Sequence, residues 1–282
     1  MSPFVDSARP AVPPAGARRS GNAPAALLAC LLGVLLSVAL VAALAPGDHW
    51  WGAEAVRMHP ALPADVSAAR LARPAPAPGG RGGYRLLELQ DDGSGRPVSW
   101  DPCRPIHYVI RAAGAPPGGQ LAITRAITRV EQVTGLRFTF DGSTQEVPRP
   151  GRPTVDAARY GERWSPVLIS WTDPGEYLQM KGYAGLGGPD TVAGSTPGHL
   201  RYVSGVVLLN RQYLSQVATW DDGQARIDAV VLHEFGHLAG LDHVTDPSQL
   251  MYRQPTPQVG GFAAGDRRGL ALLSNGPCFR DF

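Results

Sequence analysis

A short segment with three histidines, residues 232–243, most strongly constrains what this chain can fold into. His233 and His237 are four residues apart, so on an α-helix their imidazoles lie on the same face, about one turn apart. Gly240 follows, and glycine accepts the positive φ with which a helix ends and the chain reverses. The reversal brings His243 back toward the other two histidines. The spacing therefore predicts a helix that ends in a turn and three imidazoles that meet at one point.

Three imidazoles that meet in this way are typical ligands of a zinc ion. Three protein ligands leave the fourth tetrahedral position open to water, which separates catalytic from structural zinc sites. Glu234 directly follows the first histidine, so its carboxylate lies beside the ion and can take a proton from the bound water. The segment predicts one catalytic zinc ion, with His233, His237 and His243 as ligands and Glu234 as general base.

A methionine, Met251, lies eight residues after the third histidine, between Leu250 and Tyr252. The pattern His-Glu-x-x-His-x-x-Gly-x-x-His followed by a Met-turn is the metzincin signature, and Leu-Met-Tyr at this distance resembles the matrixin branch. The resemblance implies an α+β catalytic domain with a twisted mixed β-sheet, an active-site helix and a C-terminal helix. It also implies that Asp266 hydrogen-bonds the Met-turn, although this residue equally fits the negative charge of a helix N-terminus.

The chain departs from the matrixin pattern in two respects. Matrixins usually carry serine after the third histidine, where this chain has Val244, and animal matrixins have a histidine and aspartate cluster for a second, structural zinc. His107 and His199 are isolated and fit surface or core positions better than ligand positions. We therefore expect one zinc ion and a bacterial matrixin-like branch, a source that the single lysine among many arginines and alanines also suggests. Calcium binding is left open.

The N-terminal part of the chain differs in composition from the rest. Residues 1–24 are rich in Pro, Ala and Arg without helix or strand periodicity and predict a disordered cytoplasmic tail. Residues 25–45 carry no charged side chain, and about 20 apolar residues can span a bilayer as a helix. Residues 46–83 are rich in Pro and Gly and predict an extended spacer. The zinc metalloprotease domain is then expected at residues 84–282.

The uncharged run has two interpretations. Arg18 and Arg19 precede it, which favours a single transmembrane helix with the catalytic domain outside the cell. Alternatively, Ala43 and Ala45 have the small-x-small spacing of a signal-peptidase site, so the protein could be secreted after cleavage. The run is longer than the typical signal core of about 7–15 residues, and Pro46 would follow the cut. Both features favour the membrane anchor.

Two cysteines, Cys103 and Cys278, lie near the ends of the catalytic region. An oxidising compartment would let them form a disulfide that closes a very long loop. A zinc-plugging Cys103 and two free thiols are the alternatives.

Several segments of the catalytic region carry secondary-structure signals. Residues 182–188 are glycine-rich and lie where metzincins carry the edge strand that pairs with substrate, although a flexible loop fits them equally. The other expected elements are strands at 106–110, 136–140, 166–171 and 203–209, and helices at 120–134, 221–239 and 264–273.

These features predict a zinc-dependent endopeptidase that hydrolyses peptide bonds of extracellular proteins or peptides through a zinc-bound water activated by Glu234. The expected partners are a polypeptide substrate and the membrane, and a formal net charge of +2 is too small to favour nucleic acid. The alternative is a membrane-anchored, metal-containing binding module that has lost turnover. The intact Glu234 argues against it. The sequence does not specify the physiological substrate, latency or oligomeric state.

We expect residues 25–45 to remain in the mature protein as one membrane-spanning helix. Cell fractionation and N-terminal sequencing of the mature full-length product would test this. A membrane-bound chain that keeps its N-terminal tail is the expected result. A soluble product that begins near Pro46 would show that the run is a cleaved signal.

Overall fold

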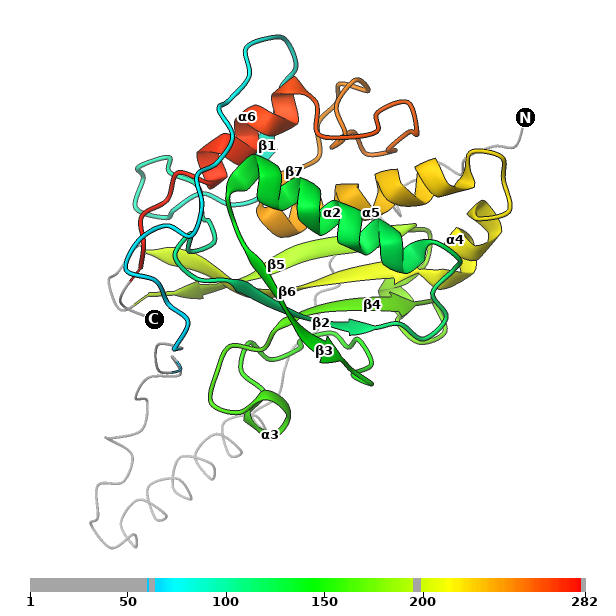
Figure 1. Ribbon diagram of the computed structural model, residues 1–282, viewed down its shortest axis with the longest axis horizontal. Coiled ribbons are helices and arrows are strands. Elements are labelled where there is room, and N and C mark those ends of the chain that lie inside the picture. The colour runs from blue at the N-terminus through cyan, green and yellow to red at the C-terminus, as the bar shows by residue number, and fades with distance from the viewer. Residues whose placement is uncertain (1–59, 61–63, 195–198, 280–282) are drawn as a thin grey trace, which may run out of the picture. The chain divides into compact units, whose positions relative to one another are not determined.

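A five-stranded mixed β-sheet is the framework of the computed structural model, which describes residues 60, 64–194 and 199–279 (Figure 1). The strand order is β3-β2-β4-β6-β5. Neighbouring strands are parallel except at one edge, where β5 runs antiparallel to β6. The strands are β2 (Ile106–Arg111), β3 (Phe138–Ser143), β4 (Val167–Thr172), β5 (Gly185–Ala193) and β6 (Leu200–Asn210).

Two long helices, α2 (Gly119–Thr134) and α5 (Gly223–Ala239), cover one face of the sheet and contact each other (Figure 1). α2 connects the parallel strands β2 and β3, which is the connection expected of a β-α-β unit. Its apolar side chains recur every three or four residues, so they form one stripe that faces the core. The buried members of this stripe are Ala122, Ile123, Ala126, Ile127 and Val130.

Shorter elements complete the described part of the chain. Two short strands, β1 and β7, form a separate antiparallel pair. These elements are β1 (Arg85–Leu86), α3 (Ala157–Tyr160), the 3₁₀ turn η1 (Leu178–Met180), α4 (Arg211–Val217), β7 (Leu241–Asp242) and α6 (Ala264–Leu273). The predicted α+β class is therefore confirmed, with a five-stranded mixed sheet, a helix that carries two of the histidines and a C-terminal helix.

Residues 185–188 of the glycine-rich segment expected at 182–188 form the start of edge strand β5, whereas residues 182–184 lie in the turn before it. Its glycines allow α5 to approach very closely. A Cβ atom added at Gly185 would lie 2.6 Å from the side chain of Glu234, and one added at Gly187 would lie 2.3 Å from the Glu234 carbonyl oxygen. Any larger residue at either position would push the edge strand away from the helix.

The range expected to be an extended spacer, residues 46–83, is partly docked on the domain, which corrects that expectation. The main chain of Ser67 donates to the Cys103 carbonyl at 2.8 Å, and that of Ala75 donates to the Val133 carbonyl at 3.0 Å. A proline-rich composition predicts the absence of regular structure, but it does not reveal which groups on the domain will bind the segment. The packed domain thus begins before residue 84.

The other N-terminal expectations concern residues outside the described part of the chain. These are the tail at 1–24, the apolar run at 25–45 and, except for residue 60, the first part of the spacer up to residue 63. Among the described residues, no helix combines the length and the apolar character needed to cross a membrane.

A disulfide joins Cys103 to Cys278, which are 175 positions apart, with their Cα atoms 5.4 Å from each other. The N-terminal segment is tied to the same region, because the Arg70 guanidinium donates to the carbonyl oxygens of Ser274 and, at 2.9 Å, Gly276. The two ends of the domain are therefore linked both covalently and by hydrogen bonds.

A buried arginine, Arg111 at the end of β2, holds the segment that leads from β4 into edge strand β5. Its guanidinium makes two hydrogen bonds to the Glu176 carboxylate, at 2.8 and 2.9 Å, and donates to the Trp171 carbonyl at 3.0 Å. Next to this pair, Arg211 binds Asp173. The ion pairs hold the start of the connection between β4 and β5.

We expect Arg111→Ala to lower the free energy of unfolding by about 2–3 kcal/mol, because it removes two charge-assisted hydrogen bonds to Glu176 and takes the guanidinium donor away from the Trp171 carbonyl. Arg125→Ala is the matched control, since its ion pair with Asp228 is also 2.8 Å long but much more exposed. It should cost less than about 1 kcal/mol. Denaturant unfolding of both variants measures the difference, and equal losses would contradict a special role for Arg111.

Candidate metal centre

The three histidines predicted as ligands come together at the end of helix α5. His233 and His237 lie on its last two turns and are buried, with exposed fractions of 2% and 7%. The helix ends at Gly240, whose φ of 111° is in the region that favours glycine. The chain then passes through β7 and brings in His243. The sequence spacing predicted this reversal.

The three imidazole Nε2 atoms form a nearly equilateral triangle. The separations are 3.1 Å between His233 and His237, 3.1 Å between His233 and His243, and 3.2 Å between His237 and His243. A tetrahedral zinc ion with Zn–N distances of about 2.0–2.1 Å requires nitrogen separations of about 3.3 Å. The donor set and its spacing therefore fit a zinc ion.

Backbone carbonyls fix the tautomer of the two helical histidines. Nδ1 of His233 lies 2.8 Å from the Leu250 oxygen, and Nδ1 of His237 lies 2.7 Å from the Leu241 oxygen. A carbonyl oxygen can only accept a hydrogen bond, so both Nδ1 atoms carry the proton. Each Nε2 then turns its lone pair toward the centre of the triangle, where a bound cation would relieve the mutual repulsion.

The environment keeps the imidazoles neutral, as metal binding requires. Burial, with help from the neighbouring histidines, lowers the pKa of His233 to about 3. Burial likewise lowers the pKa of His243 to about 4, with smaller contributions from His237 and Arg253. The pKa of His237 is also lowered, mainly by burial. At neutral pH the three side chains therefore do not need to lose a proton before they bind a metal ion.

Glu234 is a residue of α5 whose side chain faces edge strand β5, and it is 6% exposed. Its side chain faces Gly185 and accepts a hydrogen bond from the Gly187 main chain. Burial raises the pKa of this carboxyl to about 8, partly offset by that hydrogen bond. Such a pKa suits a group that exchanges a proton near neutral pH. Among the residues that the structure describes, the ligand atoms that cluster here belong to the three histidines, so the placement of Glu234 fits a base better than a ligand.

Met251 forms the expected floor of the site and is 1% exposed. A Cβ atom added at Gly236, between the two helical histidines, would lie 2.4 Å from the methionine sulfur. The fully buried Asp266 carboxylate accepts hydrogen bonds from the main chains of Leu250 at 2.8 Å, Met251 at 3.4 Å and Ala263 at 2.9 Å. Asp266 thus has both roles considered from the sequence, since it holds the Met-turn and caps α6.

Sequence reasoning did not identify the main-chain partners of this site. The carbonyl groups of Leu241 and Leu250 and the amide of Gly187 orient the functional side chains. Backbone atoms are present at every residue, so no residue type marks them. The glycine-rich run at 185–188 was the one available signal.

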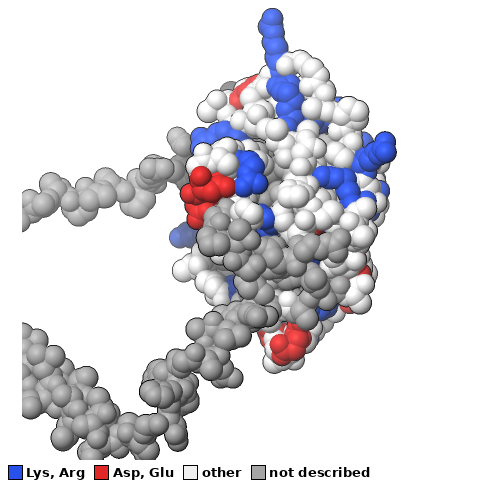
Figure 2. All heavy atoms as spheres, turned by 90° about the vertical axis from the view of Figure 1, so that its left-hand side faces the viewer, with Lys and Arg blue, Asp and Glu red and all other residues white. Residues whose placement is uncertain are grey.

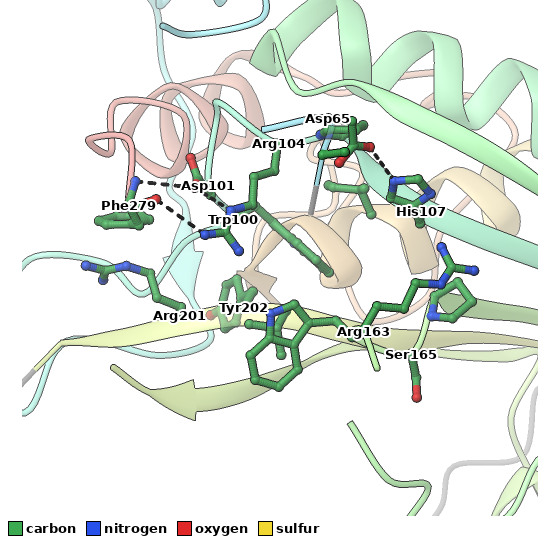
Figure 3. A pocket seen from close by; sticks show the side chains of 16 residues that line it. Asp65, Trp100, Asp101, Arg104, His107, Arg163, Ser165, Arg201, Tyr202 and Phe279 are labelled. Carbon is green, nitrogen blue, oxygen red and sulfur yellow. Dashed lines mark hydrogen bonds and ion pairs between the residues drawn. The ribbon is translucent and has the colours of Figure 1, made fainter. Parts of the chain in front are cut away.

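A separate cavity of about 270 Å³ is lined by Trp100, Arg104, Tyr202 and other residues, and neither the three histidines nor Glu234 line it (Figure 3). Charged groups in its wall bind one another. Arg104 pairs with Asp101 at 3.1 Å. The ring nitrogens of His107, which was predicted to be isolated, each lie 2.7 Å from a carboxylate oxygen, one of Asp65 and one of Asp141.

Asp101, Cys103 and Cys278 form a second group of potential metal-binding side chains. Both sulfurs of this group are joined in the disulfide.

We expect metal-free Glu234→Gln to be more thermostable than the metal-free wild type, with a gap that grows from about pH 5 to pH 8. In this range the folded wild type keeps a carboxyl proton that the unfolded chain releases, so its stability falls as pH rises. Glutamine has no such proton. Thermal unfolding in the presence of a chelator at several pH values measures the gap. Glu162→Gln, at an exposed position, is the control, and a pH-independent gap would be inconsistent with the raised pKa.

Comparison with known proteins concerns this same region. The matrixin family model matches residues 188–270, which include α5, the three histidines and the Met-turn. No curated protein matches the chain in sequence.

Similar solved structures include metalloproteinase-II from Bacteroides fragilis (15% identity, 67% of this chain, TM-score 0.35), of which the match covers 56%. They also include the hatching enzyme zinc-protease high choriolytic enzyme 1 from the medaka fish Oryzias latipes (14% identity, 68% of this chain and 96% of that chain, TM-score 0.31). A third is the GM1-bound form of the ECX AB5 holotoxin (11% identity, 69% of this chain and 83% of that chain, TM-score 0.33). No property of the chain follows from likenesses this weak. The family match spans the converging imidazoles and the Met-turn, so the region around the three histidines is similar to that of a matrixin-like metzincin.

Proposed function

We propose that this chain is a zinc-dependent endopeptidase. The observation that carries the proposal is the convergence of three Nε2 atoms, 3.1–3.2 Å apart, on one point beside a buried glutamate. His233, His237 and His243 would hold the ion. Three protein ligands leave a position open for water or substrate, and a site built for structure alone would need a fourth ligand.

A zinc ion held there supplies Lewis acidity, which lowers the pKa of water and polarises a peptide carbonyl. The positive charge of a bound ion would favour the ionised form of the nearby carboxyl, so in the metal-loaded protein Glu234 can take a proton from the attacking water. It then delivers that proton to the nitrogen of the leaving amine as the peptide bond breaks. The Gly187 main chain orients the carboxylate through a hydrogen bond, so the proton acceptor is in place before substrate arrives.

The edge of the sheet supports a polypeptide substrate. β5 is the last strand in the order, so among the described residues its outer side has no strand partner. Gly185 and Gly187 place this strand against Glu234. An extended peptide that adds to the free edge through main-chain hydrogen bonds would run directly past the catalytic base.

The catalytic domain is further proposed to act outside the cell, held to the membrane by residues 25–45. Support comes from the disulfide between Cys103 and Cys278, since such bonds persist in oxidising compartments, and from the uncharged run itself. In Figure 2, basic and acidic side chains of the described residues are interspersed over one face. A mixed surface of this kind gives no reason to propose nucleic acid as a partner.

We expect Glu234→Gln to keep bound zinc and to lose at least about 100-fold in peptide hydrolysis, because glutamine preserves the shape of the side chain but cannot accept the proton. His243→Ala should lose both zinc and activity, since a two-histidine site holds the ion much more weakly. Zinc content and cleavage of a generic peptide are measured for both variants and for wild type with and without a chelator.

Each result has a defined consequence. Near-wild-type turnover in Glu234→Gln would refute the proposed base, and full zinc retention with activity in His243→Ala would refute the ligand set. A wild type that binds zinc but shows no chelator-sensitive hydrolysis of a peptide library would favour the alternative of a binding module without turnover.

A further inference from the structure

A buried glutamine, Gln249, directly precedes the Met-turn and is 3% exposed. Its side-chain oxygen accepts hydrogen bonds from the main chains of Gly265 at 2.8 Å and Asp266 at 3.3 Å. Its amide nitrogen donates to the Ser248 hydroxyl at 2.9 Å. A buried polar side chain with all these contacts fixes its surroundings strongly, because each lost partner leaves an unsatisfied group in the interior.

The side chains of Gln249 and Asp266 connect the Met-turn and the start of α6 in opposite directions. Gln249 binds the first turn of α6 through its side chain, and Asp266 in that turn binds the main chains of Leu250 and Met251. The Met-turn and the start of α6 are thus joined by a reciprocal clamp. If the Gln249 side chain is removed, the main chain that positions the Asp266 carboxylate loses its own anchor.

The clamp leads directly to a metal ligand. The residue held by Asp266 is Leu250, and the Leu250 carbonyl accepts the Nδ1 hydrogen of His233 at 2.8 Å. Hydrogen bonds of this kind set the ring orientation of a ligating histidine. A shift of the Met-turn would therefore be felt at the Nε2 atom that points to the metal.

The N-terminal segment closes over the glutamine. A Cβ atom added at Gly82 would lie 2.4 Å from the Gln249 amide nitrogen, and Gly82 has a φ of +104°. Arg268 of α6 donates to the carbonyl oxygens of Gly80, at 3.1 Å, and Gly82. Position 82 requires glycine for two reasons. Glycine leaves room for the Gln249 side-chain amide, and it adopts the positive φ without steric cost.

We propose that Gln249 is a positioning residue for the metal centre and that Gly82, more than 160 positions upstream, seats its side chain. The proposal rests on the proposed function only in so far as the three histidines bind zinc. Neither residue touches the ion or the substrate. Both act through the Met-turn on the orientation of His233.

The test uses the full chain with two pairs of variants. Gln249→Met keeps the length of the side chain and removes its hydrogen bonds, and Gln90→Met is its control because Gln90 is also buried and binds main-chain groups. Gly82→Ala brings a methyl group against Gln249. Its control is Gly93→Ala, where φ is also positive, +72°, but nothing lies within 4 Å.

Zinc affinity is measured on the folded proteins by competition with a chromophoric chelator, and ligand geometry is measured by the visible absorption of the cobalt-substituted proteins. Gln249→Met and Gly82→Ala are expected to weaken zinc binding about 10-fold, at the lower end of the effects of outer-shell changes, and to alter the cobalt spectrum. The two controls should lower only the melting temperature. If Gln249→Met does not fold, the Gly82→Ala pair decides.

Wild-type zinc affinity and an unchanged cobalt spectrum in the folded variants would overturn the inference, and so would an equal loss of affinity in the controls. Failure of the wild type itself to bind one zinc ion would refute the ligand set and with it the proposed function. The two failures are therefore distinguishable.

Discussion

The hydrogen bonds from two imidazole Nδ1 atoms to backbone carbonyls are the interactions on which the rest of the site depends. They fix His233 against Leu250 and His237 against Leu241, so both Nε2 atoms present lone pairs to one point. The spacing of histidines on a helix places the side chains on one face, but it does not set the rotation of each ring. The turn after α5 and the Met-turn set that rotation, and they must be held in place by contacts of their own.

Glycines allow the helix, the edge strand and the Met-turn to pack this closely. Gly236 lets Met251 pack against the helix between the histidines, and Gly187 lets edge strand β5 reach Glu234. Both contacts are closer than any side chain would allow, so sheet, helix and Met-turn meet at distances that only a main chain without Cβ permits. Edge strand β5 and the Met-turn are therefore both packed directly against the helix that carries His233, Glu234 and His237.

Local patterns explain why part of this arrangement could be predicted from the sequence. The four-residue interval between His233 and His237 and the glycine at 240 act within one helix and its end, and the predicted elements near them agree with the structure. The docking of residues 64–83, the partners of His107 and the contact between Gly82 and Gln249 join segments far apart in the chain. Such contacts depend on the final fold and leave no periodic signal. The catalytic role of Glu234 stays a prediction.

The packed domain includes the N-terminal segment of residues 64–83. Residues 80–83 lie against the first turn of α6 and against Gln249, and the disulfide at Cys278 ties the other end of the described chain to the region before β2. Residues 80–83, through Gln249, and α6, through Asp266, therefore both support the Met-turn. A cut within 64–83 would leave all three histidines in the chain but would detach the segment that packs against Gln249. The arrangement of the three histidines is thus a property of the whole domain, although they lie within eleven residues of one another.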